Sequence, residues 1–449
     1  MTAPHLLRRL GARDAALIVM GGIVGSGIFR NPSVVAKLAP SAPVVLAVWA
    51  IGGGIALLGG GIFAELAARR PHDGGLYAYM RDAFHPALAF TYGWTLLLVS
   101  QSGGMAAAAV TFAGYVAPWL GGPGSAAAIE RALAIAAIGT FTLVNALGVR
   151  QGASTQNIFM LLKIAAIAGF VVVGFLAPHA AAVHAPPLAF AGGSAVAAMG
   201  LAMVPVLFSY SGWQTSSFMS AELREPQRTL PRGLLWGVLA VVALYLAVNV
   251  VCVRALGIEA LAATNAPASA IAQLAFGPAG AWIMTAIVAV STLGFLSNQI
   301  LTSPRVYFQM AADGTFFKGL AKIDPRTHVP TLAIVLQGTV AAIIALSGRY
   351  DQILNYVTSV DYVFFGLSAI ALVVFRNRDA RDPQAPRPFY RIPLHPWSTL
   401  LFLIVAWGIV GDVLVTSPLD TSVGLGILLS GIPVYALFAL RARRERAKT

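Results

Sequence analysis

A long apolar segment near the start of the chain contains Gly21-Gly22-Ile23-Val24-Gly25-Ser26-Gly27-Ile28, a run that disfavours continuous helix. A second apolar segment, about 190 residues later, contains Ser209-Tyr210-Ser211-Gly212. Because hydrocarbon offers no hydrogen-bond partner, a membrane span is interrupted only where its freed backbone groups face protein or water. Paired interruptions predict two discontinuous helices whose ends hold a charged small molecule near the middle of a membrane.

The composition excludes an ordinary soluble protein. Of the 449 residues, 58% are hydrophobic and only 10% are charged. Runs of about 18 or more mostly apolar residues are long enough to cross a bilayer. Twelve such spans are predicted: 14–38, 42–67, 86–118, 131–148, 155–177, 194–221, 233–256, 277–303, 329–347, 353–375, 397–417 and 421–440.

The net charge of +13 is a topology signal. If the N-terminus is cytoplasmic, 24 of the 30 Lys and Arg residues fall in cytoplasmic segments, as the positive-inside rule predicts. We therefore expect a multi-pass protein of the cell membrane, the inner membrane in a Gram-negative cell, with both termini cytoplasmic. The distribution disfavours nucleic-acid binding. The single cysteine, Cys252, allows no intrachain disulfide and no metal-ligand pattern.

The spans are expected to form one membrane domain over residues 1–449. The paired breaks predict inverted repeats at about 14–177 and 194–375, each of five spans, followed by two further helices at about 397–440. The glycine runs 52–54 and 59–61 predict close helix packing, as small residues do in membrane bundles.

Four segments, in the same order along the chain, carry a family resemblance. They are 22–29, 64–79, 208–231 and 305–314. Together they resemble the amino acid/polyamine/organocation (APC) superfamily, particularly its L-amino-acid exchangers (LAT-like) and cationic amino acid permeases. The resemblance implies an all-α, LeuT-like fold with discontinuous helices 1 and 6, and amino acid transport. Leu76 departs from the pattern, because many relatives carry an acidic residue there.

An amino acid presents a carboxylate and an ammonium, and burying either unpaired costs several kcal/mol. Backbone amides and the helix dipole at the start of the outer half of span one favour an anion. By resemblance, the carboxylate lies against Gly25, Ser26 and Gly27. The resemblance assigns the ammonium to the freed carbonyls of Ile23, Phe208 and Ser211.

Two side chains at the second break are further candidates. Phe208 resembles the aromatic that closes the outer route over a bound substrate in the exchangers, with ordinary packing as the alternative. Gln214 occupies a position where some cation-specific relatives carry a carboxylate. Its neutral amide favours substrates without a side-chain charge.

Three ionisable residues are candidates for coupling and gating. Lys163 lies in span five, where a charged side chain is costly and functional by default; snorkelling to the interface is the alternative. By resemblance, it contacts the unwound part of span one and replaces a sodium ion of sodium-coupled relatives, which implies sodium-independent transport. Arg30 and Asp361 are predicted to form an outer-gate ion pair, although Asp361 could instead bond only to neighbouring backbone.

The leading hypothesis is secondary active transport of neutral L-amino acids by exchange. Proton-coupled amino acid symport by the same fold is the alternative. A transporter-like nutrient sensor is the alternative from a different functional class. No cluster of His, Asp or Glu suits an enzyme, and we expect no metal and no cofactor. Besides the amino acid, the lipid bilayer is the expected partner. The loop after span three, 121–125, has no cysteine, so no disulfide-linked accessory subunit is expected.

Overall fold

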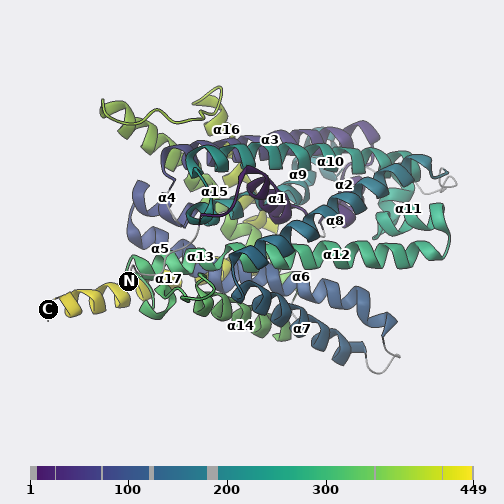
Figure 1. Cartoon of the computed structure of the whole chain (residues 1–449). Coiled ribbons are helices and arrows are strands. Elements are labelled where there is room, and N and C mark those ends of the chain that lie inside the picture. Colours follow the sequence, from purple (N-terminus) through teal and green to yellow (C-terminus); the bar gives the residue numbers. More distant parts are fainter. Residues whose placement is uncertain are drawn as a thin grey trace.

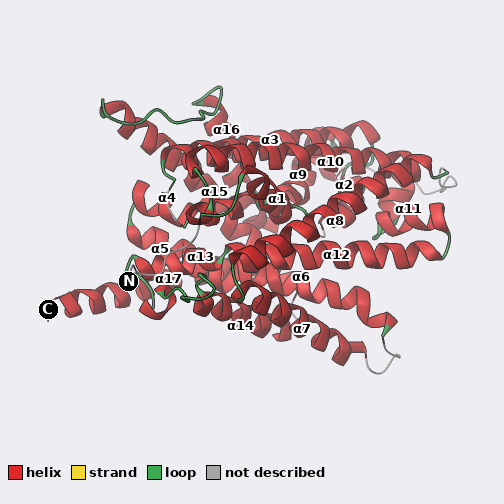
Figure 2. Cartoon of the chain, in the orientation of Figure 1, coloured by secondary structure: helices red, strands yellow, loops and turns green. Residues whose placement is uncertain are grey.

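The computed structural model describes residues 8–25, 27–71, 74–120, 126–178, 191–347, 350–416 and 418–446. Within these residues the regular structure is helical, apart from one isolated bridge between Leu10 and Leu223 (Figure 2). The predicted all-α class is confirmed.

The first repeat predicted from the sequence comprises eight α-helices. They are α1 (Ala12–Ile23), α2 (Gly27–Leu38), α3 (Ala42–Arg69), α4 (Leu76–Ala83), α5 (Pro86–Thr95), α6 (Gln101–Val116), α7 (Ala126–Ala146) and α8 (Val149–Leu176). A single π-helical turn, Leu96–Ser100, joins α5 to α6. A short 3-10 turn, Ala117–Trp119, follows α6.

The rest of the described chain also consists of α-helices separated by short 3-10 segments. A 3-10 turn, Ala191–Gly193, precedes α9, and a longer 3-10 helix, Trp213–Glu222, follows it. The α-helices are α9 (Ala195–Tyr210), α10 (Pro226–Ala263), α11 (Pro267–Phe276), α12 (Ala279–Thr302), α13 (Pro304–Ala312), α14 (Thr331–Ser347), α15 (Tyr350–Arg381), α16 (Trp397–Thr416) and α17 (Pro418–Arg446). Another 3-10 turn, Lys318–Ala321, separates α13 from α14.

Each predicted span corresponds to a helix or a broken helix. In the described residues, ten spans are long and apolar enough to cross a membrane, with α9 and the 3-10 helix after it counted as one, and α1 with α2 forms one more that is bent by 47°. The predicted span 329–347 is α14, an apolar helix of 17 residues. The fifth span begins at Val149, earlier than the predicted 155, because polar residues before the apolar run continue the same helix.

Small residues allow the central helices to approach closely. A Cβ on Gly233 of α10 would lie 2.5 Å from the Cβ of Ala15 in α1. A Cβ on Gly53 of α3 would lie 2.7 Å from a methyl group of Val242 in α10. The close-packing prediction for the α3 glycine runs is therefore confirmed at Gly53, while Gly54 has no neighbouring atom within 4 Å.

The bundle is elongated along its helices, and the chain reaches its C-terminus at the end where α4, α13 and the segment between α15 and α16 lie (Figure 1). We call this the basic end, because it carries ion-paired arginines from four elements. These are Arg69, Arg81, Arg305 and Arg376.

Candidate functional site

The first break separates α1 from α2. Val24 has an extended backbone (φ −74°, ψ 94°), so the carbonyls beyond α1 have lost their helical donors. Three side chains from other helices replace them. Lys163 Nζ donates to Val24 O at 2.6 Å, Tyr245 Oη to Ile23 O at 3.3 Å, and Ser291 Oγ to Gly25 O at 3.4 Å. The break is therefore satisfied by protein, as a membrane interior requires.

Lys163 lies in the protein interior. Its exposed fraction is 1%, and it sits about 21 Å along α8 from Val149, at 1.5 Å per residue. Because α8 begins at Val149, before the predicted boundary of span five, Lys163 lies deep within the helix. The alternative of a lysine that snorkels to the interface therefore does not describe its position. Its ammonium places a positive charge directly at the unwound backbone. The coupling role stays a prediction.

The second break lies between α9 and the 3-10 helix Trp213–Glu222. Ser211 is extended, and Gly212 has φ 118°, a conformation that side chains with a Cβ rarely adopt. Ser211 N and Oγ both donate to Phe208 O, at 3.2 and 2.8 Å. The carbonyl of Leu207, left without its helical donor, accepts from Tyr362 Oη at 2.9 Å.

The two breaks touch each other. A Cβ on Gly212 would lie 2.1 Å from Gly22 O, and one on Gly22 would lie 2.5 Å from Gly212 O. Beyond this contact, Asn31 Nδ2 donates to Pro205 O at 3.0 Å and to Ser209 Oγ at 2.7 Å, which ties α2 to α9. The residues predicted from two distant segments are thus brought to one place.

The predicted binding residues surround this contact. Gly25, Gly27, Phe208 and Ser211 are half-buried, whereas Ile23 is buried. The first N–H groups of α2, which begins at Gly27, have no intrahelical partner and are available to an anion. Because two donors of Ser211 already occupy the carbonyl of Phe208, that oxygen can accept an ammonium only after Ser211 moves. Ser26 lies outside the described residues.

Gln214 is buried, and among the described residues its Oε1 has no hydrogen-bond partner. A buried polar atom without a partner is uncommon and is costly unless something pairs with it. Phe295 of α12 is a further neighbour of the break: a Cβ on Gly25 would lie 3.7 Å from its ring, and one on Gly104 of α6 would lie 3.6 Å from it. Both glycines leave room beside this half-buried aromatic side chain.

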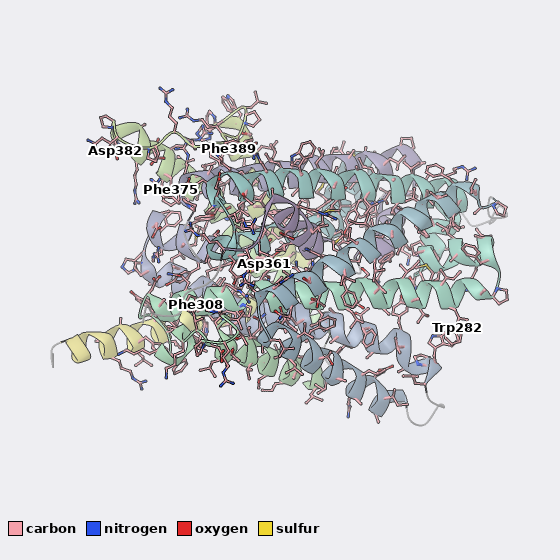
Figure 3. All side chains as sticks on the ribbon, viewed as in Figure 1. Trp282, Phe308, Asp361, Phe375, Asp382 and Phe389 are labelled. Carbon is pink, nitrogen blue, oxygen red and sulfur yellow. The ribbon has the colours of Figure 1, made fainter. Side chains whose placement is uncertain are left out.

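Arg30 and Asp361 are not paired in this conformation. Arg30 is exposed, and within the described part of the chain no ion pair joins it to Asp361. Asp361 instead accepts from Ser100 Oγ at 2.7 Å, at the end of the π-helical turn, and its label lies in the middle of the bundle in Figure 3. The outer-gate pair stays a prediction for another conformation.

Ion pairs join neighbouring elements at the basic end. Glu65, fully buried in α3, accepts from Arg69, from Arg376 of α15 at 2.6 and 2.8 Å, and from the amide of Ile392 at 2.8 Å. Glu222 and Arg305, both buried, form another pair at 2.9 Å. The described residues contain no group of three or more His, Cys, Asp or Glu side chains suited to a metal.

Sequence reasoning singled out Lys163 but missed the other side chains that hold the breaks. A polar side chain within a span, such as Asn31, was a usable signal because it directly follows the first break. Tyr245, Ser291, Tyr362 and Phe295 come from distant spans, and nothing in their local sequence points to the breaks.

A family model described as "Amino acid permease" matches residues 10–432. The chain belongs to the amino acid permease family. Membership makes amino acid transport across a membrane its function class, in agreement with the resemblance and the broken helices.

Individual relatives of the permease are similar over most of their length. The mouse b(0,+)-type amino acid transporter 1 is 31% identical over 89% of this chain and 82% of that protein. The human large neutral amino acids transporter small subunit 2 is 31% identical over 96% of this chain and 80% of that one. The serine/threonine exchanger SteT of Bacillus subtilis (strain 168) is 27% identical over 96% of both chains. These relatives are transporters.

Proposed function

We propose that this permease exchanges neutral L-amino acids across the cell membrane without sodium, by alternating access around the two breaks. The observation that carries the proposal is the bond from Lys163 Nζ to Val24 O. A fixed ammonium at the freed carbonyls of span one supplies the positive charge that a bound sodium ion would otherwise bring. Transport then needs no metal ion at this position.

The substrate assignment follows from the charges at the breaks. The carboxylate is proposed to lie against the backbone of Gly25, Ser26 and Gly27, where the N-terminus of α2 favours an anion. The ammonium is proposed to face the carbonyls of Ile23 and Ser211, and that of Phe208 once Ser211 releases it. The neutral amide of Gln214 supports substrates without a side-chain charge, and the large neutral amino acids transporter gives the same indication by name.

The two ends of the bundle support alternating access. At the basic end the pairs of Glu65 and Glu222 are formed, while Arg30 and Asp361 are apart. Transport by this scheme requires that the two gates never open together, so we propose that closure of the Arg30–Asp361 pair accompanies release of the basic end. Spans 14–177 and 194–375 would move as the two inverted repeats, with 397–440 outside them.

The orientation is part of the proposal. We infer that the basic end and both termini face the cytoplasm, since the arginines gather there as the positive-inside rule predicts. A disulfide-linked accessory subunit is not part of the proposal, although the loop 121–125 lies outside the described residues. The proposal is a transporter and not an enzyme, which agrees with the named activities of the relatives.

The test is uptake of a panel of radiolabelled amino acids into sodium-free proteoliposomes, loaded either with unlabelled amino acid or with buffer. Uptake that requires internal amino acid supports exchange and names the substrates. The proposal is contradicted if uptake occurs only when sodium is added. It is also contradicted if none of the amino acids in the panel is taken up. A pH gradient applied to empty vesicles tests whether uptake is coupled to protons.

Proton-coupled symport is the second candidate. Two ionisable groups inside the spans favour it. Lys163 Nζ donates to Val24 O, and Asp361 accepts from Ser100 Oγ. Uptake into empty vesicles that rises with an inward proton gradient would support symport over exchange. Insensitivity to the gradient would exclude it.

A further inference from the structure

A cavity of about 190 Å³ lies at the basic end, away from the breaks, between the ends of α3 and α15 and the segment 382–396 that leads to α16. Its charged lining residues are Arg69, Arg376, Asp379, Arg387 and Arg391. A cavity of this size can admit a small polar group.

Two of the lining arginines belong to a fixed network. Arg69 bonds to Glu65 and to Asp379, at 2.7 and 2.5 Å, and Arg376 bonds to Glu65 at 2.6 Å. Arg70 completes the network through Asp379 at 2.5 Å. Because both carboxylates are already paired, they cannot also neutralise the remaining lining arginines.

The other two, Arg387 and Arg391, are exposed, and within the described part of the chain neither has an ion-pair partner. Asp382, the remaining acid of the same segment, accepts from the amide of Gln384 in its own turn at 2.9 Å. The positive surroundings also affect His395. Partial burial is the largest cause that lowers the pKa of His395, and the charge of Arg376 is the next largest. The cavity thus has a surplus of positive charge and rigid donors in its wall.

Two exposed aromatic side chains lie in or next to the segment that lines the cavity. Phe389 is 49% exposed and Trp397 is 73% exposed, and the guanidinium of Arg232 lies 4.9 Å from the centre of the Phe389 ring. Figure 3 shows Phe389 and Asp382 on the segment that projects beyond the helices. Exposed aromatic residues of this kind sit at the headgroup level of a bilayer.

We propose that this cavity binds a phosphate-bearing anion, which bridges Arg387 and Arg391 to the fixed arginines of α3 and α15. Guanidinium groups match phosphate oxygens in charge and geometry. Basic pockets between helices at the cytoplasmic face bind the headgroups of anionic lipids. The anion can come from a lipid headgroup or from free phosphate, and the chemistry of the cavity suits both.

Binding is tested on the purified full chain in neutral detergent by native mass spectrometry, with phosphatidylglycerol, zwitterionic phosphatidylcholine and inorganic phosphate as probes. The informative variant is Arg387→Gln/Arg391→Gln. We expect phosphatidylglycerol to bind in preference to phosphatidylcholine, and the variant to bind it roughly tenfold more weakly or worse. Displacement of the lipid by inorganic phosphate would identify the phosphate group alone as the ligand, and its persistence would identify the lipid.

The matched control is Arg326→Gln/Arg381→Gln, which removes the same charge from exposed positions that do not line the cavity. It should bind phosphatidylglycerol within about twofold of the unmodified protein. Equal losses in both variants would show general attraction to a basic surface and would overturn the proposal. So would unchanged binding by the Arg387→Gln/Arg391→Gln variant. Thermal melting of each variant establishes that all are folded.

Discussion

Replacement of Lys163 by methionine separates a functional ammonium from a structural one. Methionine keeps most of the stem that packs beside Gly294, where the Cε of Lys163 lies 2.7 Å from the position of a Cβ. It removes the charge and the donor that reaches Val24 O at 2.6 Å. The carbonyl of an unwound segment then loses its partner in a water-poor interior.

Two effects of opposite sign follow from Lys163→Met. A hydrogen bond from a charged group contributes about 1.5–3 kcal/mol, which corresponds to a roughly tenfold to hundredfold loss of exchange rate if the bond holds the break in its working geometry. A lysine within a span costs about 2.5–3.5 kcal/mol on insertion scales. We therefore expect exchange to fall while membrane insertion and melting temperature are retained or improved.

The assay is initial-rate exchange in proteoliposomes, with the melting temperature of the same preparation. Tyr245→Phe is the matched control, because it removes a neutral and longer bond, at 3.3 Å, to the neighbouring carbonyl of Ile23. Its loss should not exceed about tenfold. Exchange by Lys163→Met within about twofold of the unmodified protein would refute the reasoning. A melting temperature that falls in parallel with exchange would show a merely structural lysine.

Four further substitutions test the breaks and the proposed gates. Gly212→Ala places a Cβ 2.1 Å from a backbone oxygen at φ 118°, so we expect a destabilisation of more than about 2 kcal/mol, seen as a lower melting temperature. Glu65→Gln breaks a buried ion-pair network and should destabilise the protein by about 3–5 kcal/mol, measured in the same way. Arg30→Gln and Asp361→Asn should each slow exchange, and the double variant should be no slower than the slower single one, because the two residues act as one gate.

Gly212→Ala and Glu65→Gln each have a matched control. Gly114→Ala, in open space on α6, should not lower the melting temperature, and an equal loss there would remove the argument from Gly212. Glu225→Gln removes an exposed carboxylate that lies 3.6 Å from Arg228, and we expect no measurable effect. If the losses from Arg30→Gln and Asp361→Asn multiply in the double variant, the two side chains act independently and the gate is disproved.

Much of the architecture was predictable because a membrane imposes its constraints segment by segment. Apolar length identified the spans, including α14, and backbone preferences identified the breaks before Gly27 and at Gly212. These are local properties. A glycine run or a twenty-residue apolar stretch has the same consequence in hydrocarbon whatever its neighbours are. The positive-inside rule also uses only local information, the positions of charges, and the orientation that it gives stays a prediction.

The tertiary structure decided which groups meet. The contact of Gly22 with Gly212, the donation from Tyr245 to Ile23 and the tie between Asn31 and Pro205 join segments far apart in the chain. No local pattern records such pairings, because they depend on how the helices pack. The sequence by itself therefore determined the spans, the breaks and the kinds of residue at the site. Only packing decided that the freed carbonyls of Ile23, Val24 and Leu207 meet side-chain donors from distant helices, and that Arg30 and Asp361 are apart.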